Sequence, residues 1–550
     1  MSTSRLRSSR RPQLRANTVL LLVVAFLVVA LNTRFWRVVF SAHDFAGLHG
    51  IGVAVAVAGA LFALTTIMLL PLSFRWTLKP GLTVVLLLAA GAAFFMSDFG
   101  AVIDRHALAS VYETDAREAT EWVSARMLMT LGLLGVLPAI LLWWVRIDWQ
   151  GPVRELWSRI KLALLVCALL GISALSFGKD IASLVRNHME LRHLANPFAL
   201  LAAQLSYMDH ARNDNRPLEK IGLDAKRGAA LAPGQRPTVL LLAIGESARA
   251  ASYGSLGYGR DTDPKMRALA TVNFTDVHSC GTNTATSLPC MFSGVGRADY
   301  RDGMAKYREN LLDVLMRAGY DVVWIDNNTG SKRLAMRATE KFLGDGKDPA
   351  LCNPEGCYDE VLLRQLKQDL PAVKRDTVFV IHLLGSHGPA YYARYPAEFA
   401  TFKPECRSNQ LQQCDDKQLH NTYDNTIHYA DHIVGSATEM LRDDAAVDPA
   451  VLYVSDHGES LGEHGLYLHG APYAIAPDQQ TRVPMQLWVS DRFAARRGLD
   501  LACLRARAGQ PMSHDNFFHS VLGLADVDTA LRKPPLDFTA GCTGKVSPTP

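Results

Sequence analysis

The chain has 550 residues, of which 49% are hydrophobic and 20% are charged, and its formal net charge at pH 7 is +4. This length is enough for two or three domains. The composition excludes a disordered or collagen-like chain, and the small net charge gives no signal for binding nucleic acid. The long apolar runs lie within about the first 180 residues, so a purely soluble chain is excluded as well.

Five apolar stretches are long enough, or nearly so, to cross a bilayer. They cover residues 17–36, 48–70, 81–96, 127–145 and 160–177. A signal peptide is the alternative for the first stretch, but its apolar core is long, no small-x-small cleavage site follows it, and four more stretches come after it. The sequence therefore predicts a membrane domain of five helices over residues 1–177.

Basic residues at the ends of these stretches predict the orientation in the membrane. They precede the first stretch and follow the second and the fourth: Arg5, Arg7, Arg10, Arg11, Arg15, Arg75, Lys79, Arg146, Arg154, Arg159 and Lys161. The short loop after the first stretch has no Lys or Arg between residues 38 and 48. The N-terminus is therefore expected in the cytoplasm, and the chain after the fifth crossing on the opposite side.

Eight of the nine cysteines lie in this outer region, and an even number in an exported domain is typical of disulfides. Connectivity does not follow from sequence alone, but pairing of neighbours is the simplest interpretation: Cys280–Cys290, Cys352–Cys357, Cys406–Cys414 and Cys503–Cys542. Zinc binding by thiolates is the alternative, although the outer region has no C-x-x-C pair.

Residues 178–236 link the membrane domain to a soluble domain at 237–550. The linker mixes basic and apolar residues, which favours either an amphipathic helix on the membrane surface or an ordinary packed helix. In the soluble domain, apolar runs of strand length alternate with helical patterns: TVLLLAIGES, DVVWIDNN, TVFVIHLLGSH, AVLYVSDHGES and VPMQLWVSD. Continuous hydrophobicity indicates strands buried on both faces, as in the parallel sheet of an α/β fold.

Most of these runs end in polar residues, namely Glu246, Asp326, His387, and Asp456 with His457. Sites of open α/β sheets form at the carboxyl ends of strands, so this arrangement favours an enzyme. Carboxylate and imidazole ligands suit Zn²⁺ and, less specifically, Mn²⁺. An isolated Asp-His pair is usually structural; the three residues Glu246, Asp456 and His457 at corresponding strand ends favour a metal site.

The segment SCGTNTATSLPCMFSG is rich in hydroxyl groups and is bracketed by Cys280 and Cys290. It is either a polar loop or the source of a metal-activated hydroxyl nucleophile. Composition does not choose among its hydroxyl residues, which are Thr282, Thr284, Thr286 and Ser287. His387 and His469 are structural histidines taken singly, but together they could bind a second metal ion or phosphate oxygens. Lys332 could neutralise a phosphate, although a lone lysine is normally a solvated charge.

Several long motifs carry a resemblance to a known family: GESARAASYGSLGYGRDTDP, SCGTNTATSLPCMFS, DNNTGSK, GSHGPAYYARYP, YDNTIHYAD and SDHGESLGEHGLYLHG. In this order, and over nearly the whole chain, they resemble the phosphoethanolamine transferases of Gram-negative bacteria, which include mobile colistin resistance enzymes. The resemblance implies an inner-membrane domain of five helices and a periplasmic domain with the alkaline phosphatase/sulfatase fold.

The resemblance also implies roles for individual residues. It assigns the nucleophile to Thr284, zinc binding to Glu246, Asp456, His457 and the Thr284 oxygen, and substrate binding to Lys332, His387 and His469, with Glu459 as a further candidate. A family pattern of Asn, Thr and Glu, spaced by four on one helical face, falls on Ser110, Thr114 and Glu118. Serine in place of asparagine removes an amide from this expected head-group contact, and a solvated stripe is the alternative.

The function implied is zinc-dependent transfer of phosphoethanolamine from phosphatidylethanolamine to lipid A by a monomeric, multi-pass inner-membrane enzyme. The added amine reduces the negative surface charge, which weakens binding of polymyxin-like cationic peptides. Alternatives are the same chemistry on a lipopolysaccharide core sugar or another periplasmic glycan, and a phosphoglycerol transferase. An alternative of another class is a catalytically inactive membrane scaffold or transporter, although a transporter should carry charged residues within its spans.

Overall fold

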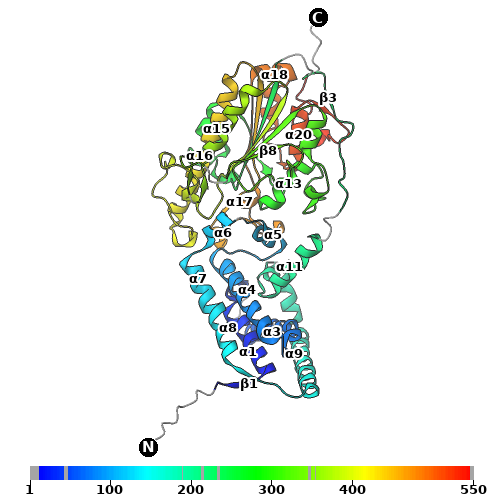
Figure 1. The fold of residues 1–550 in the computed structure, drawn as a ribbon, viewed down its shortest axis with the longest axis vertical. Helices are drawn as coiled ribbons and strands as arrows, with labels where there is room; N and C mark the ends of the chain where they lie inside the picture. Colours follow the sequence, from blue (N-terminus) through cyan, green and yellow to red (C-terminus); the bar gives the residue numbers. More distant parts are fainter. Residues whose placement is uncertain are drawn as a thin grey trace, which may run out of the picture. The chain divides into compact units, whose positions relative to one another are not determined.

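The computed structural model describes residues 11–42, 47–114, 116–188, 190–211, 216–231, 236–344, 348–353 and 355–544 (Figure 1). The chain divides into two compact units. Unit 1 is Met1–Arg105 with Val123–Ser206, and unit 2 is His106–Trp122 with Tyr207–Pro550. The segment His106–Trp122 therefore belongs to unit 2, although the chain on both sides of it belongs to unit 1.

Unit 1 is built almost entirely of apolar helices. Its elements are β1 (Gln13–Arg15), α1 (Ala16–Ala30), α2 (Thr33–Ala42), α3 (Gly47–Leu69), α4 (Leu78–Asp98), α7 (Ala125–Leu131), a π-helical turn (Gly132–Val136), α8 (Leu137–Trp144), β2 (Arg146–Asp148), α9 (Pro152–Asn187) and α10 (Leu191–Leu194). In the described residues, four helices are long and apolar enough to cross a membrane, and five if the bent pair α1 and α2 is one span. On that count the predicted five-helix domain is confirmed.

The first span is not the straight helix that its apolar run predicts. The bent pair Ala16–Ala30 and Thr33–Ser41 turns by 55°. Asn32, in the break, donates to the carbonyl oxygens of Leu27 at 2.9 Å and Asn196 at 2.7 Å, and Asn196 in turn donates to that of Leu31 at 3.2 Å. Polar backbone groups freed inside an apolar region need such partners, and hydropathy alone does not reveal them.

The predicted fifth span, residues 160–177, lies inside α9, which continues to Asn187 with a non-helical residue at Phe177. Helix α11 (Phe198–Ala211) follows after α10. The linker is therefore largely helical up to residue 211. Whether these helices lie on the membrane surface or pack as ordinary helices stays a prediction.

Unit 2 contains a seven-stranded sheet with the order β5-β15-β12-β4-β11-β7-β8. The strands are β4 (Thr238–Gly245), β5 (Val272–Phe274), β7 (Asp321–Asp326), β8 (Thr339–Phe342), β11 (Thr377–His382), β12 (Asp448–Ser455) and β15 (Met485–Val489). All five runs predicted as strands are present, and β12, β4, β11, β7 and β8 are parallel. The last run, β15, instead pairs antiparallel with β12.

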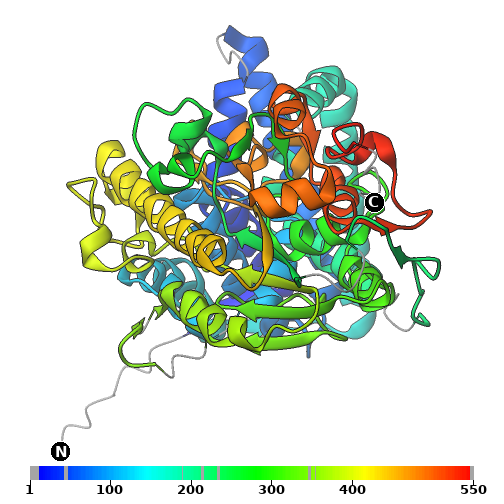
Figure 2. The same cartoon turned by 90° about the horizontal axis from the view of Figure 1, so that it is seen from above.

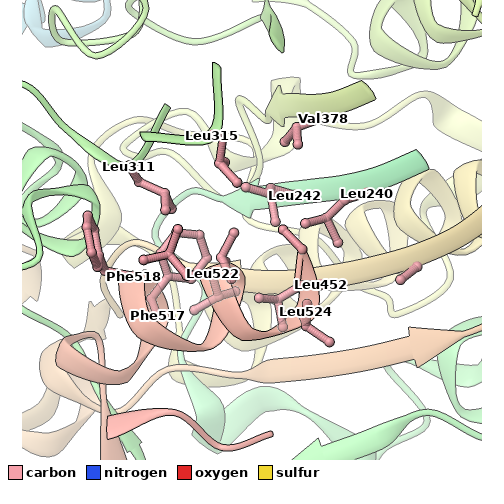
Figure 3. Close-up of a cluster of buried hydrophobic side chains, with 14 of the residues drawn as sticks. Leu240, Leu242, Leu311, Leu315, Val378, Leu452, Phe517, Phe518, Leu522 and Leu524 are labelled. Atoms are coloured by element: carbon pink, nitrogen blue, oxygen red, sulfur yellow. The ribbon is translucent and has the colours of Figure 1, made fainter. Parts of the chain in front are cut away.

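Helices cover both faces of this sheet (Figures 1 and 2). The helices of unit 2 from residue 264 onward are α12 (Pro264–Ala268), α13 (Thr284–Ser293), α14 (Leu311–Arg317), α15 (Glu360–Asp369), α16 (Asp416–Asp443), α17 (Asp478–Thr481), α18 (Asp491–Arg497), α19 (Leu501–Arg507) and α20 (Asp515–Leu524). Figure 3 shows the core on one face, where leucines of α14 and α20 pack on Leu240 and Leu242 of β4. Because β4 is buried along its whole length, its apolar run is continuous rather than alternating.

Four disulfides join the cysteines that the sequence analysis pairs as neighbours, from Cys280–Cys290 to Cys503–Cys542. Cys167, in α9, is the only free cysteine within the described ranges. All four bonds lie in unit 2. Short loop-rich segments such as 406–414 therefore gain a covalent constraint that their own cores do not supply.

Candidate active site

The carboxyl ends of β4 and β12 bring the predicted metal ligands together. Glu246 follows β4 directly, and Asp456 and His457 follow β12. The two strands pair in parallel with Gly245 opposite Ser455, so the residues that come next share one edge of the sheet. The local sequence specifies each strand, and the pairing of β4 with β12 brings Glu246, Asp456 and His457 together as a cluster.

Three side chains of this cluster converge on one point. His457 Nε2 lies 3.3 Å from Glu246 Oε1 and 3.4 Å from Asp456 Oδ2. All three side chains are buried. Their candidate ligand atoms lie within 4.8 Å of one another, a spacing at which one metal ion could be held. A second, overlapping group of this kind consists of His457, Glu459 and His469.

The surrounding hydrogen bonds leave the inward-facing atoms available. The Asp456 Oδ1 atom accepts from the backbone N–H groups of Ser247 and His457, at 3.2 and 2.7 Å. Its Oδ2 atom is buried and, among the described residues, has no hydrogen-bond partner. His457 Nδ1 lies 2.9 Å from the carbonyl oxygen of Gly458, which turns Nε2 toward the carboxylates. A buried carboxylate oxygen without a partner is costly unless a cation binds it, so the cluster fits a metal ion.

The electrostatics of the cluster also favour a cation. Burial and the negative charge of Glu246 raise the pKa of Asp456 to about 6. Burial also opposes ionisation of Glu246, but the hydrogen bond and charge of His457 hold the pKa of Glu246 well below its usual range. Burial opposes the charged form of His457 too, yet the two carboxylates raise its pKa to about 10. The two buried carboxylates thus stabilise a positive charge beside them, either on the His457 ring or on a bound metal ion.

The structure separates the four hydroxyl groups that composition leaves equivalent. Thr282 Oγ1 donates to the carbonyl oxygen of Ala471 at 2.7 Å, and Ser287 Oγ donates to that of Asp456 at 2.5 Å. Thr286 Oγ1 donates to Asp302 Oδ1 at 3.2 Å. These three hydroxyl groups are engaged in bonds that hold the surrounding loops.

The fourth hydroxyl, that of Thr284, faces the candidate metal ligands. Its Oγ1 donates to Glu246 Oε2 at 3.0 Å and lies 3.3 Å from His457 Nε2. Thr284 is the first residue of α13, whose N-cap residue Asn283 accepts from the N–H of Thr286 at 2.9 Å. The partial positive charge at the start of a helix favours anions, so this position suits a phosphoryl group.

A buried network around Asn328 was not among the predicted site residues. Asn328 Nδ2 donates to Glu246 Oε2 at 2.8 Å and to the carbonyl oxygen of Leu383 at 3.0 Å. The same amide lies 3.3 Å from His382 Nε2, while His382 Nδ1 lies 2.8 Å from Asp326 Oδ2. Asp326 and His382 are the last residues of β7 and β11. Their position at strand ends is the feature of the sequence that could have indicated this network.

His469 and Glu459 form a second pair beside the ligands. Glu459 Oε2 lies 2.8 Å from His469 Nδ1, and Glu459 Oε1 accepts from the Tyr391 hydroxyl at 2.5 Å. The ring centroids of His469 and His457 are 4.4 Å apart, and those of His469 and His387 are 5.9 Å apart. Burial lowers the pKa of His387 to about 3, so its imidazole is neutral at pH 7. The ring of His469 therefore lies next to the candidate metal ligand His457, and the ring of His387 lies next to that of His469.

The remaining predicted residues are placed differently. Lys332 lies in the turn after β7, partly buried, with a left-handed φ of 47°. The single helix expected for Ser110, Thr114 and Glu118 is wrong, because α5 (Arg105–Glu113) ends before Thr114 and α6 (Ala116–Trp122) begins after it. Thr114 Oγ1 bonds back to the carbonyl oxygen of Ser110 at 2.7 Å, and such back-bonding competes with continuation of a helix. The side chain of Glu118 lies outside the described residues.

The disulfide beside Thr284 provides a test of loop geometry. Replacing Cys280 and Cys290 by serine should lower the free energy of unfolding by about 2–4 kcal/mol and also reduce activity, because this bond braces the loop that holds Thr284. Serine at Cys503 and Cys542 is the control, since the segment closed by that bond does not contain Thr284. Thermal unfolding and transfer rate per folded molecule are measured for both. Equal activity losses in the two variants would contradict a local effect on Thr284.

Sequence comparisons match the chain along nearly its whole length. A family model described as Sulfatase matches residues 237–527, and one described as Phosphoethanolamine transferase EptA/EptB matches residues 61–212. The chain is 38% identical over 536 residues to the phosphoethanolamine transferase EptA of Escherichia coli, which covers 97% of this chain and 98% of that protein. It is 35% identical over 480 residues to the phosphatidylethanolamine transferase Mcr-1 of Escherichia coli, covering 85% and 88%.

The fold comparison agrees. An integral membrane lipooligosaccharide phosphoethanolamine transferase A from Neisseria meningitidis superposes with a TM-score of 0.92 at 32% identity, covering 97% of this chain and all of that one. This likeness confirms the fold class expected from the sequence, a helical membrane domain with an alkaline phosphatase/sulfatase-like domain. Because relatives 35% and 38% identical are matched over most of their own length, the chain belongs to the phosphoethanolamine transferase family and is an enzyme of that class.

Proposed function

We propose that this enzyme transfers phosphoethanolamine from phosphatidylethanolamine to lipid A, with zinc bound in the cluster and Thr284 as the nucleophile. The observation that carries the proposal is the position of the Thr284 hydroxyl, 3.0 Å from Glu246 Oε2 and 3.3 Å from His457 Nε2. A zinc ion held by Glu246, Asp456 and His457 would acidify a neighbouring hydroxyl and offset negative charge on a phosphoryl group.

The residues of the chain divide the reaction into two displacements. Thr284 Oγ1 attacks phosphorus, the new O–P bond forms as the P–O bond to diacylglycerol breaks, and the hydroxyl proton ends on the diacylglycerol oxygen. An acceptor oxygen then attacks the same phosphorus, its new O–P bond forms as the Thr284 Oγ1–P bond breaks, and the acceptor proton returns to the Thr284 oxygen. Glu246 orients the hydroxyl through its hydrogen bond, so the attacking oxygen is already aimed before the lipid binds.

The neighbouring residues suit the phosphate and the acceptor. His387 and His469, whose rings are neighbours, are proposed to contact the phosphoryl oxygens, and Lys332 is proposed to offset their negative charge. We further propose zinc rather than manganese, because two carboxylates and one imidazole with one open position match a catalytic zinc site. Ser110, Thr114 and Glu118 are proposed to contact the lipid head group.

The location follows from the orientation predicted above. The N-terminus would lie in the cytoplasm and unit 2 in the periplasm of a Gram-negative cell, with the enzyme acting as a monomer on lipids of the inner membrane. Lipid A is supported as the acceptor by relatives named Kdo(2)-lipid A phosphoethanolamine 7''-transferase, 28–30% identical to this chain. Addition of the amine would reduce the negative charge of the cell surface, which attracts the cationic peptide polymyxin.

Trapping the covalent intermediate tests this function. The full chain incubated with phosphatidylethanolamine and no acceptor should carry phosphoethanolamine on the peptide that contains Thr284, as mapped by mass spectrometry. Mass spectrometry of lipopolysaccharide from cells with and without the enzyme should find the group on lipid A. An adduct on another residue refutes the mechanism, and modification of a core sugar alone refutes the acceptor.

A further inference from the structure

The segment His106–Trp122 is part of unit 2, the catalytic unit, and a buried ion pair joins it to the rest of that unit. Glu121, in α6, lies 2.5 Å from Arg394 through its Oε2 atom, and the two side chains are 4% and 2% exposed. The backbone oxygen of Glu121 also accepts from Asn409, which lies in the loop closed by Cys406–Cys414. A segment that the chain inserts between two membrane helices thus supplies the counter-charge for an arginine buried in the catalytic unit.

Arg394 uses the rest of its guanidinium on the main chain near the site. Its Nε donates to the carbonyl oxygen of His387 at 2.7 Å, and its Nη1 donates to that of Glu355 at 2.9 Å. The planar fork of arginine reaches three acceptors in one orientation, which lysine cannot do. Because Arg394 Nε donates to the backbone carbonyl oxygen of His387, this bond fixes the turn from which the imidazole projects.

The charge of Arg394 makes the arrangement depend on Glu121. An arginine whose side chain is 2% exposed needs a buried counter-charge, and removing that partner leaves an uncompensated cation in the interior. The guanidinium would then turn toward other acceptors or water. The turn that carries His387 would lose its fixed position, and small displacements of a substrate-binding group reduce rates strongly.

We propose that Arg394 is a positioning residue for His387 in phosphoethanolamine transfer, and that Glu121 of the inserted segment holds Arg394 in place. The proposal rests on the proposed function, in which His387 contacts the transferred phosphate. On this proposal the segment 106–122 also supports the transfer site through Glu121. This role is separate from the head-group contact proposed for Ser110, Thr114 and Glu118.

A double-mutant cycle in the full-length enzyme separates positioning from mere structural support. R394Q should lower kcat/KM on the order of 10–100-fold in the wild-type background, since the His387 turn shifts. In the H387A background the same change should cost less than about 3-fold, because there is no imidazole left to misplace. E121Q should act in the same direction as R394Q and lose its effect in the same background. The control is R497Q, which breaks another buried ion pair, that of Arg497 with Asp526. Its effect on kcat/KM should be the same in the wild-type and H387A backgrounds.

Different results would contradict the positioning role of Arg394 and the proposed function. Equal fold losses from R394Q in the wild-type and H387A backgrounds would overturn the positioning role, as would full activity of H387A. An active T284A variant would overturn the proposed function instead. If R394Q does not accumulate as folded protein, R394K replaces it, because lysine keeps the charge but cannot make the three donations together.

Discussion

Thr284→Ala is expected to fold, to keep its metal and to lose transfer by on the order of 10⁴-fold or more. The Thr284 hydroxyl contacts the side chains of Glu246 and His457, so its loss removes the proposed attacking oxygen but no core packing. Without that oxygen, the phosphoryl group has no covalent route through the enzyme. Steady-state transfer from phosphatidylethanolamine, measured with thermal unfolding and metal content on the same preparation, checks this.

Two matched variants sharpen the result for Thr284. Thr284→Ser keeps the hydroxyl and should retain part of the activity, with a loss from the extra freedom of a side chain that is not β-branched. Thr286→Ala removes a hydroxyl from the same helix, one bonded to Asp302, and should keep activity close to that of the wild type. Full transfer by Thr284→Ala, or loss in Thr286→Ala as severe as in Thr284→Ala, would assign the nucleophile elsewhere.

Asp456→Ala and His457→Ala are each expected to release the metal and abolish transfer. Loss of a residue that only supports a ligand typically weakens metal affinity about 10–100-fold, so loss of a ligand should exceed that. The carboxylate of Asp456 has a buried oxygen with no hydrogen-bond partner among the described residues, and the bond from His457 to Gly458 turns the His457 ring toward it. Each substitution therefore leaves the other ligands without the geometry that a metal ion requires.

Metal analysis of purified enzyme measures this directly. The wild type should contain zinc, lose activity to a chelator and regain it when zinc is added, because ligand binding and metal occupancy are coupled. His420→Ala provides the control, since His420 is on α16 and bonds to Asp416 of its own helix. Zinc content and activity that are unchanged in both Asp456→Ala and His457→Ala would show that the cluster is not the metal site.

The sheet could be predicted because its strands are encoded locally. Runs such as the one from Thr238 to Gly245 are apolar throughout, which is typical of strands buried on both faces. The direction of β15 could not be predicted in the same way, because a buried antiparallel strand has the same apolar run. The bend after Ala30 was not predicted either. Asn32, in the break, bonds to the carbonyl oxygen of Asn196, a residue far along the chain that a local pattern does not reveal.

The helix expected to carry Ser110, Thr114 and Glu118 shows a limit of spacing arguments. A period of four places residues on one face only if the helix continues, and here it ends after Glu113. The Thr114 hydroxyl, bonded back to the carbonyl oxygen of Ser110, offers the backbone an alternative to the next helical turn. Residue periodicity does not report such local competition.

The sequence by itself determined which residues could do chemistry, because Glu246, Asp456 and His457 follow apolar runs whose ends must meet at one edge of a parallel sheet. Only the tertiary structure decided which hydroxyl faces them. Thr282 and Thr286 are bonded to Ala471 and Asp302, Ser287 is bonded to the backbone oxygen of Asp456, and Thr284 alone of the four bonds to the side chain of a candidate metal ligand, Glu246. The pairing of Arg394 with Glu121 was equally hidden, since these residues are 273 positions apart. Local patterns specify elements, whereas distances between side chains far apart in the chain are set by how those elements pack.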